Sequence, residues 1–148
     1  MLLAKLGRYC WSYIDKLKLR KQIKSSNSAI CTCSFAPSGK YLFASSQSHV
    51  MLYDTRDPWN WSLLHKLPAV GISHIMTDMD ISKDETGLLY TTLNSVAHIL
   101  NIETLKQQSL AFSPGDDSDP AIIACKYYRV RELLAGNRSS ELMIYDLF

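Results

Sequence analysis

One series of short strand patterns and turns recurs along the chain from residue 29 onward. Each pattern is rich in Val, Ile, Leu, Phe, Tyr or Met and is bounded by turn residues such as Gly, Ser, Asn and Pro. The first unit is expected to contain strands at 30–35, 41–46, 49–54 and 62–67. Four short strands separated by regular turns predict an antiparallel meander.

Two further units follow in the same order. The second is expected to contain strands at 76–81, 88–93, 96–102 and 109–112, and the third at 121–127, 133–136 and 142–146. The third strand of each unit ends at Asp54, Ile102 or Asp146, so the spacing is 102 − 54 = 48 and then 146 − 102 = 44 residues. A repeat of roughly this length with four strands is typical of a blade of a WD-repeat β-propeller. The sequence therefore predicts a mainly β fold.

The expected architecture is a partial WD-repeat propeller of about two and a half four-stranded blades, since propellers repeat such sheets radially. The blades are expected at about 29–68, 69–112 and 120–148. The repeats are divergent, because the Trp-Asp dipeptide of this family is replaced by Tyr53-Asp54 and Tyr145-Asp146 and its Gly-His dipeptide is absent. Small residues in the second strands are expected to let adjacent sheets approach closely.

The length of 148 residues is short for a closed propeller, which takes about four to eight blades. Since one blade cannot bury both of its faces, the first and last sheets are expected to expose apolar side chains. We interpret the sequence as a fragment or splice form, with assembly from several chains as the alternative.

The first 27 residues have a different composition. They carry seven basic residues and Asp15, a balance of 7 − 1 = +6, whereas the remainder has 9 − 13 = −4. An apolar stripe with helical spacing is formed by Leu3, Leu6, Cys10, Tyr13 and Leu17. The segment 1–27 is thus predicted to be a basic amphipathic helix and linker that packs on the following domain. The alternatives are a mitochondrial presequence and a phosphate-binding helix.

Composition and motifs favour a protein without catalytic activity. The chain is 47% apolar and 20% charged, which argues against disorder, and no apolar run is long enough to predict a membrane span. Catalytic and nucleotide-binding motifs are absent from the sequence. We therefore expect no enzyme, no cofactor, no metal site and no small-molecule substrate.

Two pairs of chemically active residues share a strand face. Cys31 and Cys33 form one pair, for which buried structural thiols are favoured over a zinc site because a second ligand pair is missing. Asp78 and Asp80 form the other, for which an inter-blade or rim position with hydrogen bonding to a turn is favoured over a catalytic carboxylate dyad.

The loop after the third predicted strand is the most informative stretch. Arg56 offers five donors in a rigid fork, suited to the carboxylates or carbonyls of a partner, and Trp59 and Trp61 supply contact area. The alternative is that Asp54 and Arg56 make local turn hydrogen bonds while the tryptophans cap the blade edge. The residues alone favour neither interpretation.

The run Tyr53-Asp54-x-Arg56 resembles the Trp-Asp-x-Arg motif of the substrate receptors of cullin-4 RING ubiquitin ligases. The runs 49–56, 80–92, 96–102 and 134–146 are similar to one type of these receptors, the WD-repeat protein 23 or cullin-4-associated factor 11 type. The resemblance implies that Tyr53, Asp54 and Arg56 contact the ligase adaptor, damaged-DNA-binding protein subunit one. It also implies substrate proteins as partners and a place in the nucleus or cytoplasm. A generic WD-repeat scaffold is the alternative, and nucleic acid is not an expected partner.

Overall fold

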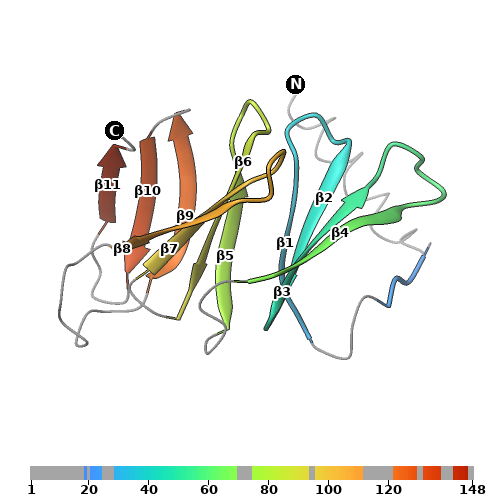
Figure 1. Ribbon diagram of the computed structural model, residues 1–148. Helices are drawn as coiled ribbons and strands as arrows, with labels where there is room; N and C mark the ends of the chain where they lie inside the picture. Colours follow the sequence, from blue (N-terminus) through green and yellow to red (C-terminus); the bar gives the residue numbers. More distant parts are fainter. Residues whose placement is uncertain are drawn as a thin grey trace, which may run out of the picture.

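The computed structural model describes residues 19, 21–24, 29–69, 75–93, 96–111, 122–129, 132–137 and 142–146. Within these ranges the chain forms three antiparallel sheets that lie side by side (Figure 1). The predicted amphipathic helix lies outside the described residues, apart from 19 and 21–24, which are in no helix or strand. No helix in the described part of the chain is long and apolar enough to cross a membrane.

Each sheet is a meander in which strands adjacent in sequence are adjacent in space. The first sheet contains β1 (Ile30–Phe35), β2 (Tyr41–Ser46), β3 (His49–Asp54) and β4 (Ser62–Pro68). The second contains β5 (Met76–Ile81), β6 (Gly87–Thr92), β7 (Val96–Asn101) and β8 (Gln107–Ala111). The third contains β9 (Ile122–Arg129), β10 (Glu132–Asn137) and β11 (Leu142–Asp146). The predicted strands are confirmed, with shifts at their ends of at most two residues, at the start of β8 and at the end of β9.

The sheets pack face to face, with β5 in contact with both β1 and β9. Between the first two sheets lies an apolar core in which Phe43, Met79, Leu88 and Tyr90 are at most 2% exposed. A fully buried side chain of this size contributes about 1.5–3 kcal/mol to folding. Burial of the inward faces of adjacent sheets is therefore what holds the stack together.

A second core joins the second and third sheets. It is formed by Leu89, Ala97, Ile122, Cys125 and Ala135. Small side chains on the second strands are fully buried: they are Ser45, Ser46, Thr91 and Thr92. Because these side chains are short, neighbouring backbones can approach closely, and the Thr77 hydroxyl on β5 reaches the carbonyl of Ile122 on β9 at 2.9 Å.

The prediction that both ends of the stack expose apolar side chains is confirmed at the third sheet. Leu142 and Ile144 of β11 are 71% and 68% exposed. At the first sheet the outcome is mixed, since Phe35 is 53% exposed whereas Met51 and Tyr53, on the face turned away from the second sheet, are 0% and 5% exposed.

Candidate protein-binding surface

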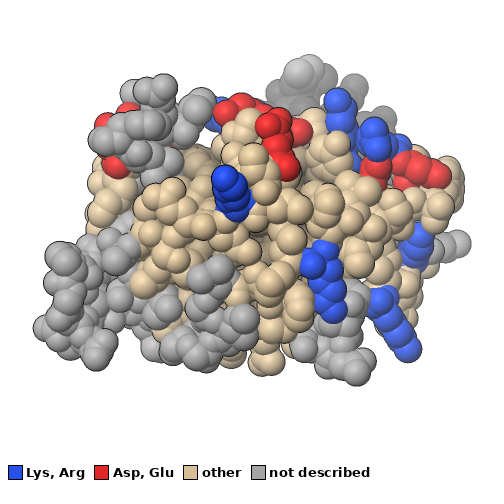
Figure 2. Space-filling model, in the orientation of Figure 1, with Lys and Arg blue, Asp and Glu red and all other residues tan. Residues whose placement is uncertain are grey.

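Four turns and loops gather at one end of the first two sheets, which we call the β1–β2 end. Because antiparallel strands alternate in direction, the β1–β2, β3–β4, β5–β6 and β7–β8 connections all lie at this end. Figure 2 shows both acidic and basic side chains at this end, along the upper edge of the view, and both kinds over the β3–β4 loop. A mixed charged surface of this kind offers hydrogen-bonding groups to a protein partner.

Asp54 and Arg56 form a two-residue ion pair where β3 ends. The Arg56 backbone N–H donates to Asp54 Oδ1 at 2.9 Å, and Arg56 Nε lies 3.0 Å from both carboxylate oxygens. Arg56 Nη2 donates to Asp54 Oδ2 as well. The Arg56 side chain is 63% exposed, against 16% for Asp54. These are the local turn hydrogen bonds expected on the alternative in which Asp54 and Arg56 stabilise the turn.

The pair also fixes the direction of the guanidinium. Its planar geometry means that a carboxylate bound through Nε and Nη2 leaves the two N–H groups of Nη1 pointing away from Asp54. The hydrogen bond from Arg56 lowers the pKa of the Asp54 carboxyl, and Asp54 in turn raises the pKa of Arg56. Both groups are therefore charged throughout the neutral pH range, and the guanidinium is presented in a fixed orientation.

The other residues of the motif region lie at different depths. Tyr53 is 5% exposed and its hydroxyl donates to Met51 Sδ at 3.8 Å, so it lies beneath the surface that carries Arg56. Trp59 is 74% exposed. Trp61 packs edge-on against Phe35, with ring centroids 5.9 Å apart, in the manner expected of a residue that caps the blade edge. Arg56 and Trp59 are thus exposed side chains of this loop, whereas Tyr53 is buried.

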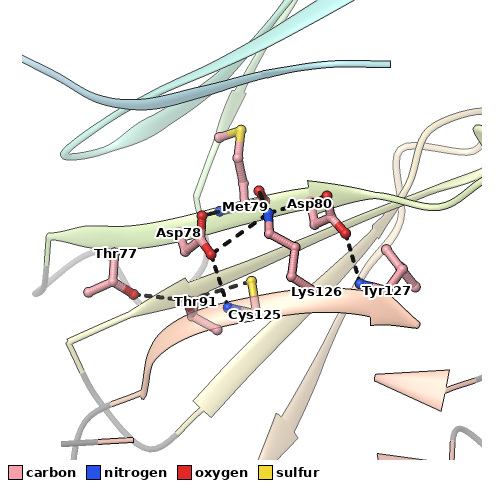
Figure 3. A network of polar contacts seen from close by, with 8 residues as sticks. All are labelled: Thr77, Asp78, Met79, Asp80, Thr91, Cys125, Lys126 and Tyr127. Atoms are coloured by element: carbon pink, nitrogen blue, oxygen red, sulfur yellow. Dashed lines mark hydrogen bonds and ion pairs between the residues drawn. The ribbon is translucent and has the colours of Figure 1, made fainter. Parts of the chain in front are cut away.

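A second polar group joins the second and third sheets (Figure 3). Asp78 Oδ2 accepts a hydrogen bond from the backbone N–H of Cys125 at 3.1 Å, and Asp80 Oδ2 accepts one from that of Tyr127 at 2.8 Å. Lys126 Nζ lies between them, 3.4 Å from Asp80 Oδ1 and 4.0 Å from Asp78 Oδ2. The two aspartates satisfy N–H groups of β9 and are structural.

This arrangement confirms that Asp78 and Asp80 share one strand face and act as hydrogen-bond acceptors. The inter-blade position is confirmed, since the donors belong to β9 of the adjacent sheet, but the prediction that a turn supplies the donors is wrong. Sequence periodicity within one repeat contains no signal for which strand of another repeat lies opposite.

The cysteines also differ from expectation. Cys31 is half-buried and Cys33 is exposed, so the predicted pair of buried thiols is wrong. The reason is that β1 is an edge strand of its sheet, where the Cys33 side chain is not covered. Cys125 is buried, and its burial raises the pKa of its thiol to about 12, which makes it unreactive at neutral pH. Among the residues that the structure describes, no group of His, Cys, Asp and Glu could hold a metal ion.

Sequence reasoning missed one contact between the first two sheets. The Glu85 carboxylate, in the β5–β6 turn, accepts hydrogen bonds from both the backbone N–H and the hydroxyl of Ser38 in the β1–β2 turn. The one available signal was the alignment of the repeats, which places the two turns at equivalent positions.

Stacked four-stranded meanders are typical of β-propeller blades, and the solved structures that match the chain include WD40 propellers. The WD40 repeats of RRP9 match with a TM-score of 0.69 at 14% identity, covering 84% of this chain and 37% of that chain. The propeller domain of Cps50 (Swd1) from Myceliophteria thermophila matches with a TM-score of 0.69 at 16% identity, covering 86% and 36%. The described chain therefore has the fold of a WD40 propeller segment.

Two curated plant proteins are similar in sequence. The LEC14B homolog of Prunus armeniaca is 25% identical over 138 residues, and the LEC14B protein of Lithospermum erythrorhizon is 24% identical over 139 residues. Each alignment covers 84% of this chain, which spans 29% of the length of these relatives. No protein-family model matches the chain.

Proposed function

We propose that this chain is a non-enzymatic, protein-binding part of a WD-repeat propeller that serves as a substrate receptor of a cullin-4 RING ubiquitin ligase. In this proposal the loop after β3 contacts the ligase adaptor, damaged-DNA-binding protein subunit one. Other surfaces of the propeller hold the substrate while the partner enzymes transfer ubiquitin. The link to the ligase depends on the resemblance of Tyr53-Asp54-x-Arg56 and of the surrounding runs to those receptors.

The observation that carries the proposal is the Asp54–Arg56 pair. An exposed arginine normally loses side-chain freedom when it binds a partner. Here Asp54 already holds Arg56 through Nε and Nη2, so less entropy is lost on binding. The end of the guanidinium, with one N–H of Nη1 parallel to the remaining N–H of Nη2, then suits a partner's carboxylate or a pair of carbonyls. Trp59, 74% exposed on the same loop, adds apolar contact area beside the charge.

The test measures binding of the purified adaptor to the chain and to its Arg56→Ala and Arg56→Lys variants. Since arginine is among the residues that dominate interface energies, we expect Arg56→Ala to weaken binding by about tenfold or more. Arg56→Lys keeps the charge but lacks the fork, and is expected to weaken binding almost as much. Lys66→Ala, at an exposed cation on β4, is the matched control and should bind as the wild type does.

One observation favours the second candidate, a WD-repeat scaffold unconnected to a ligase. The Asp54–Arg56 contacts are complete within the turn and need no partner. On this alternative, a folded wild-type chain does not bind the adaptor, and Arg56→Ala alters only the stability of the β3–β4 loop. Adaptor binding that Arg56→Ala leaves unchanged would likewise remove the role given to Arg56.

A further inference from the structure

A cleft of about 380 Å³ lies at the β1–β2 end, between the first and second sheets. One wall comes from the first sheet and is mainly apolar: Tyr41 and Phe43 of β2 and Leu64 of β4 line it, with His65 of β4 beside them. Phe43 is 2% exposed and forms part of the floor, whereas Leu64 is 43% exposed at the mouth. The cleft therefore offers apolar surface that solvent reaches.

The opposite wall comes from two turns of the second sheet and is acidic. Asp84, Glu85 and Glu103 line it, and the described lining residues include no lysine or arginine. The two oxygens of Glu85 are both used by Ser38. Asp84 and Glu103 remain as negative charges that a ligand can approach.

Asp84 is held in its ionised form. Its Oδ1 atom accepts hydrogen bonds from the Ser82 hydroxyl at 2.6 Å and the Thr86 hydroxyl at 3.0 Å, and the Ser82 bond lowers the pKa of the carboxyl. These bonds leave Oδ2 for a ligand. Glu103 follows β7, where Asn101 Oδ1 accepts from its backbone N–H at 3.1 Å, so the turn is fixed while the carboxylate is exposed.

We propose that this cleft binds an extended segment of a partner protein that carries an aliphatic side chain beside a lysine or arginine. The aliphatic side chain lies against Tyr41 and Leu64, and the cation lies between Asp84 and Glu103. Charge complementarity selects this occupant, because an acidic or purely apolar segment would leave two carboxylates without a counter-charge. The cleft adjoins the adaptor contact, because Tyr41, which lines it, pairs with Asp54 across β2 and β3. The two sites differ in the charge of their ligand, since Arg56 requires a ligand of the opposite sign.

The test uses fluorescence anisotropy with a fluorescein-labelled probe, Gly-Ser-Arg-Leu-Lys-Ser-Gly, titrated with the 148-residue chain. We expect Leu64→Ser to weaken binding by about tenfold, since it removes apolar contact area. Glu103→Gln is expected to weaken it by about threefold, a typical effect for a partly exposed charge pair. A charge-reversed probe, Gly-Ser-Glu-Leu-Glu-Ser-Gly, should not bind measurably.

Matched controls isolate the cleft. Leu63 precedes Leu64 on β4, is 47% exposed, and does not line the cleft, so Leu63→Ser should leave probe binding unchanged. Asp146→Asn, at an exposed carboxylate where β11 ends, should also have no effect. Circular dichroism melting curves verify that each variant is folded. Glu103→Gln alters an exposed turn and is not expected to change stability. Its effect on probe binding therefore tests the cleft even if Leu64→Ser lowers the stability of the chain.

Several results would overturn the proposal. These are equal weakening by Leu63→Ser and Leu64→Ser, equal binding of the two probes, and no binding of the arginine-containing probe at millimolar concentration. Sedimentation that shows a dimer dissociated by Leu64→Ser would assign the cleft to a second copy of this chain instead. Arg56→Ala removes a cation near Tyr41, so it should not weaken binding of the cationic probe. Failure of the adaptor proposal and failure of this one are therefore distinguishable.

Discussion

Glu85 occupies in the second sheet the turn position that Gly39 occupies in the first. Gly39 has φ +70° and Glu85 has φ +61°, and their backbone N–H groups bond the carbonyls of Ala36 and Ser82, respectively. A left-handed backbone suits glycine but is unfavourable for a residue with a Cβ atom. Glu85 adopts this unfavourable conformation, and its carboxylate accepts two hydrogen bonds from Ser38. The contact between the two sheets therefore offsets backbone strain in the turn.

Substitution of Glu85 should separate these two effects. Both Glu85→Ala and Glu85→Gly remove the contact with Ser38, but only Glu85→Gly relieves the left-handed strain. We expect the glycine variant to be more stable than the alanine variant by about 1 kcal/mol. Urea denaturation measures the difference, and an alanine variant of equal or greater stability would show that the turn is not strained.

Removal of Asp80 should weaken the attachment of the third sheet. Asp80→Ala leaves the backbone N–H of Tyr127 without its 2.8 Å acceptor, and an unsatisfied part-buried donor costs about 1–3 kcal/mol. Asp80→Asn retains an acceptor oxygen and should cost less. The free energy of unfolding is measured against Asp146→Ala as control, and equal stability of these three variants would contradict the role given to Asp80.

Two glycines allow a matched test of packing. A Cβ atom at Gly87 would lie 2.7 Å from the Tyr127 hydroxyl, whereas at Gly136 the nearest atom, Ala124 Cβ, would be 3.8 Å away. Gly87→Ala must therefore displace Tyr127, at a cost of about 1–3 kcal/mol. Gly136→Ala should be nearly neutral. Thermal unfolding of the two variants measures this, and equal melting temperatures would show that Tyr127 moves aside freely.

His98 should make stability depend on pH. It is 2% exposed, stacks on Tyr90 at 4.9 Å, and has Nδ1 within 3.0 Å of the Ser109 hydroxyl. Burial lowers the pKa of His98 below its ordinary value of 6.5, so the folded chain binds fewer protons than the unfolded chain. The stability that neutral His98 contributes is therefore fully present above pH 6.5. It is lost as the pH falls from there through the lowered pKa.

The variant His98→Gln removes this titration. Its free energy of unfolding, measured by urea denaturation between about pH 7 and pH 5, should decrease less than that of the wild type as the pH falls. Identical slopes in the two proteins would mean that other groups account for the pH dependence.

The strands and their order could be predicted from the sequence because each repeat contains its own signal. Apolar runs such as 49–54, separated by short polar turns, determine strand boundaries locally, and the recurrence of the pattern predicts stacked sheets. The ion pair of Asp54 and Arg56 could also be predicted from the sequence, since two residues in one turn lie close together in any fold. Contacts between repeats could not be predicted, because the periodicity within one repeat does not indicate which residues of the adjacent sheet face it.

The sequence by itself therefore determined the strand repeat, the meander topology and the candidate Asp54–Arg56 motif. Only the tertiary structure decided that Tyr53 is buried while Arg56 is exposed, and that Asp78 and Asp80 bind β9 and not a turn. It also decided that Leu64 of the first repeat and Asp84 and Glu103 of the second line one cleft. The physical reason is that the burial and partners of a side chain depend on how whole sheets stack, an outcome summed over many residues distant in sequence.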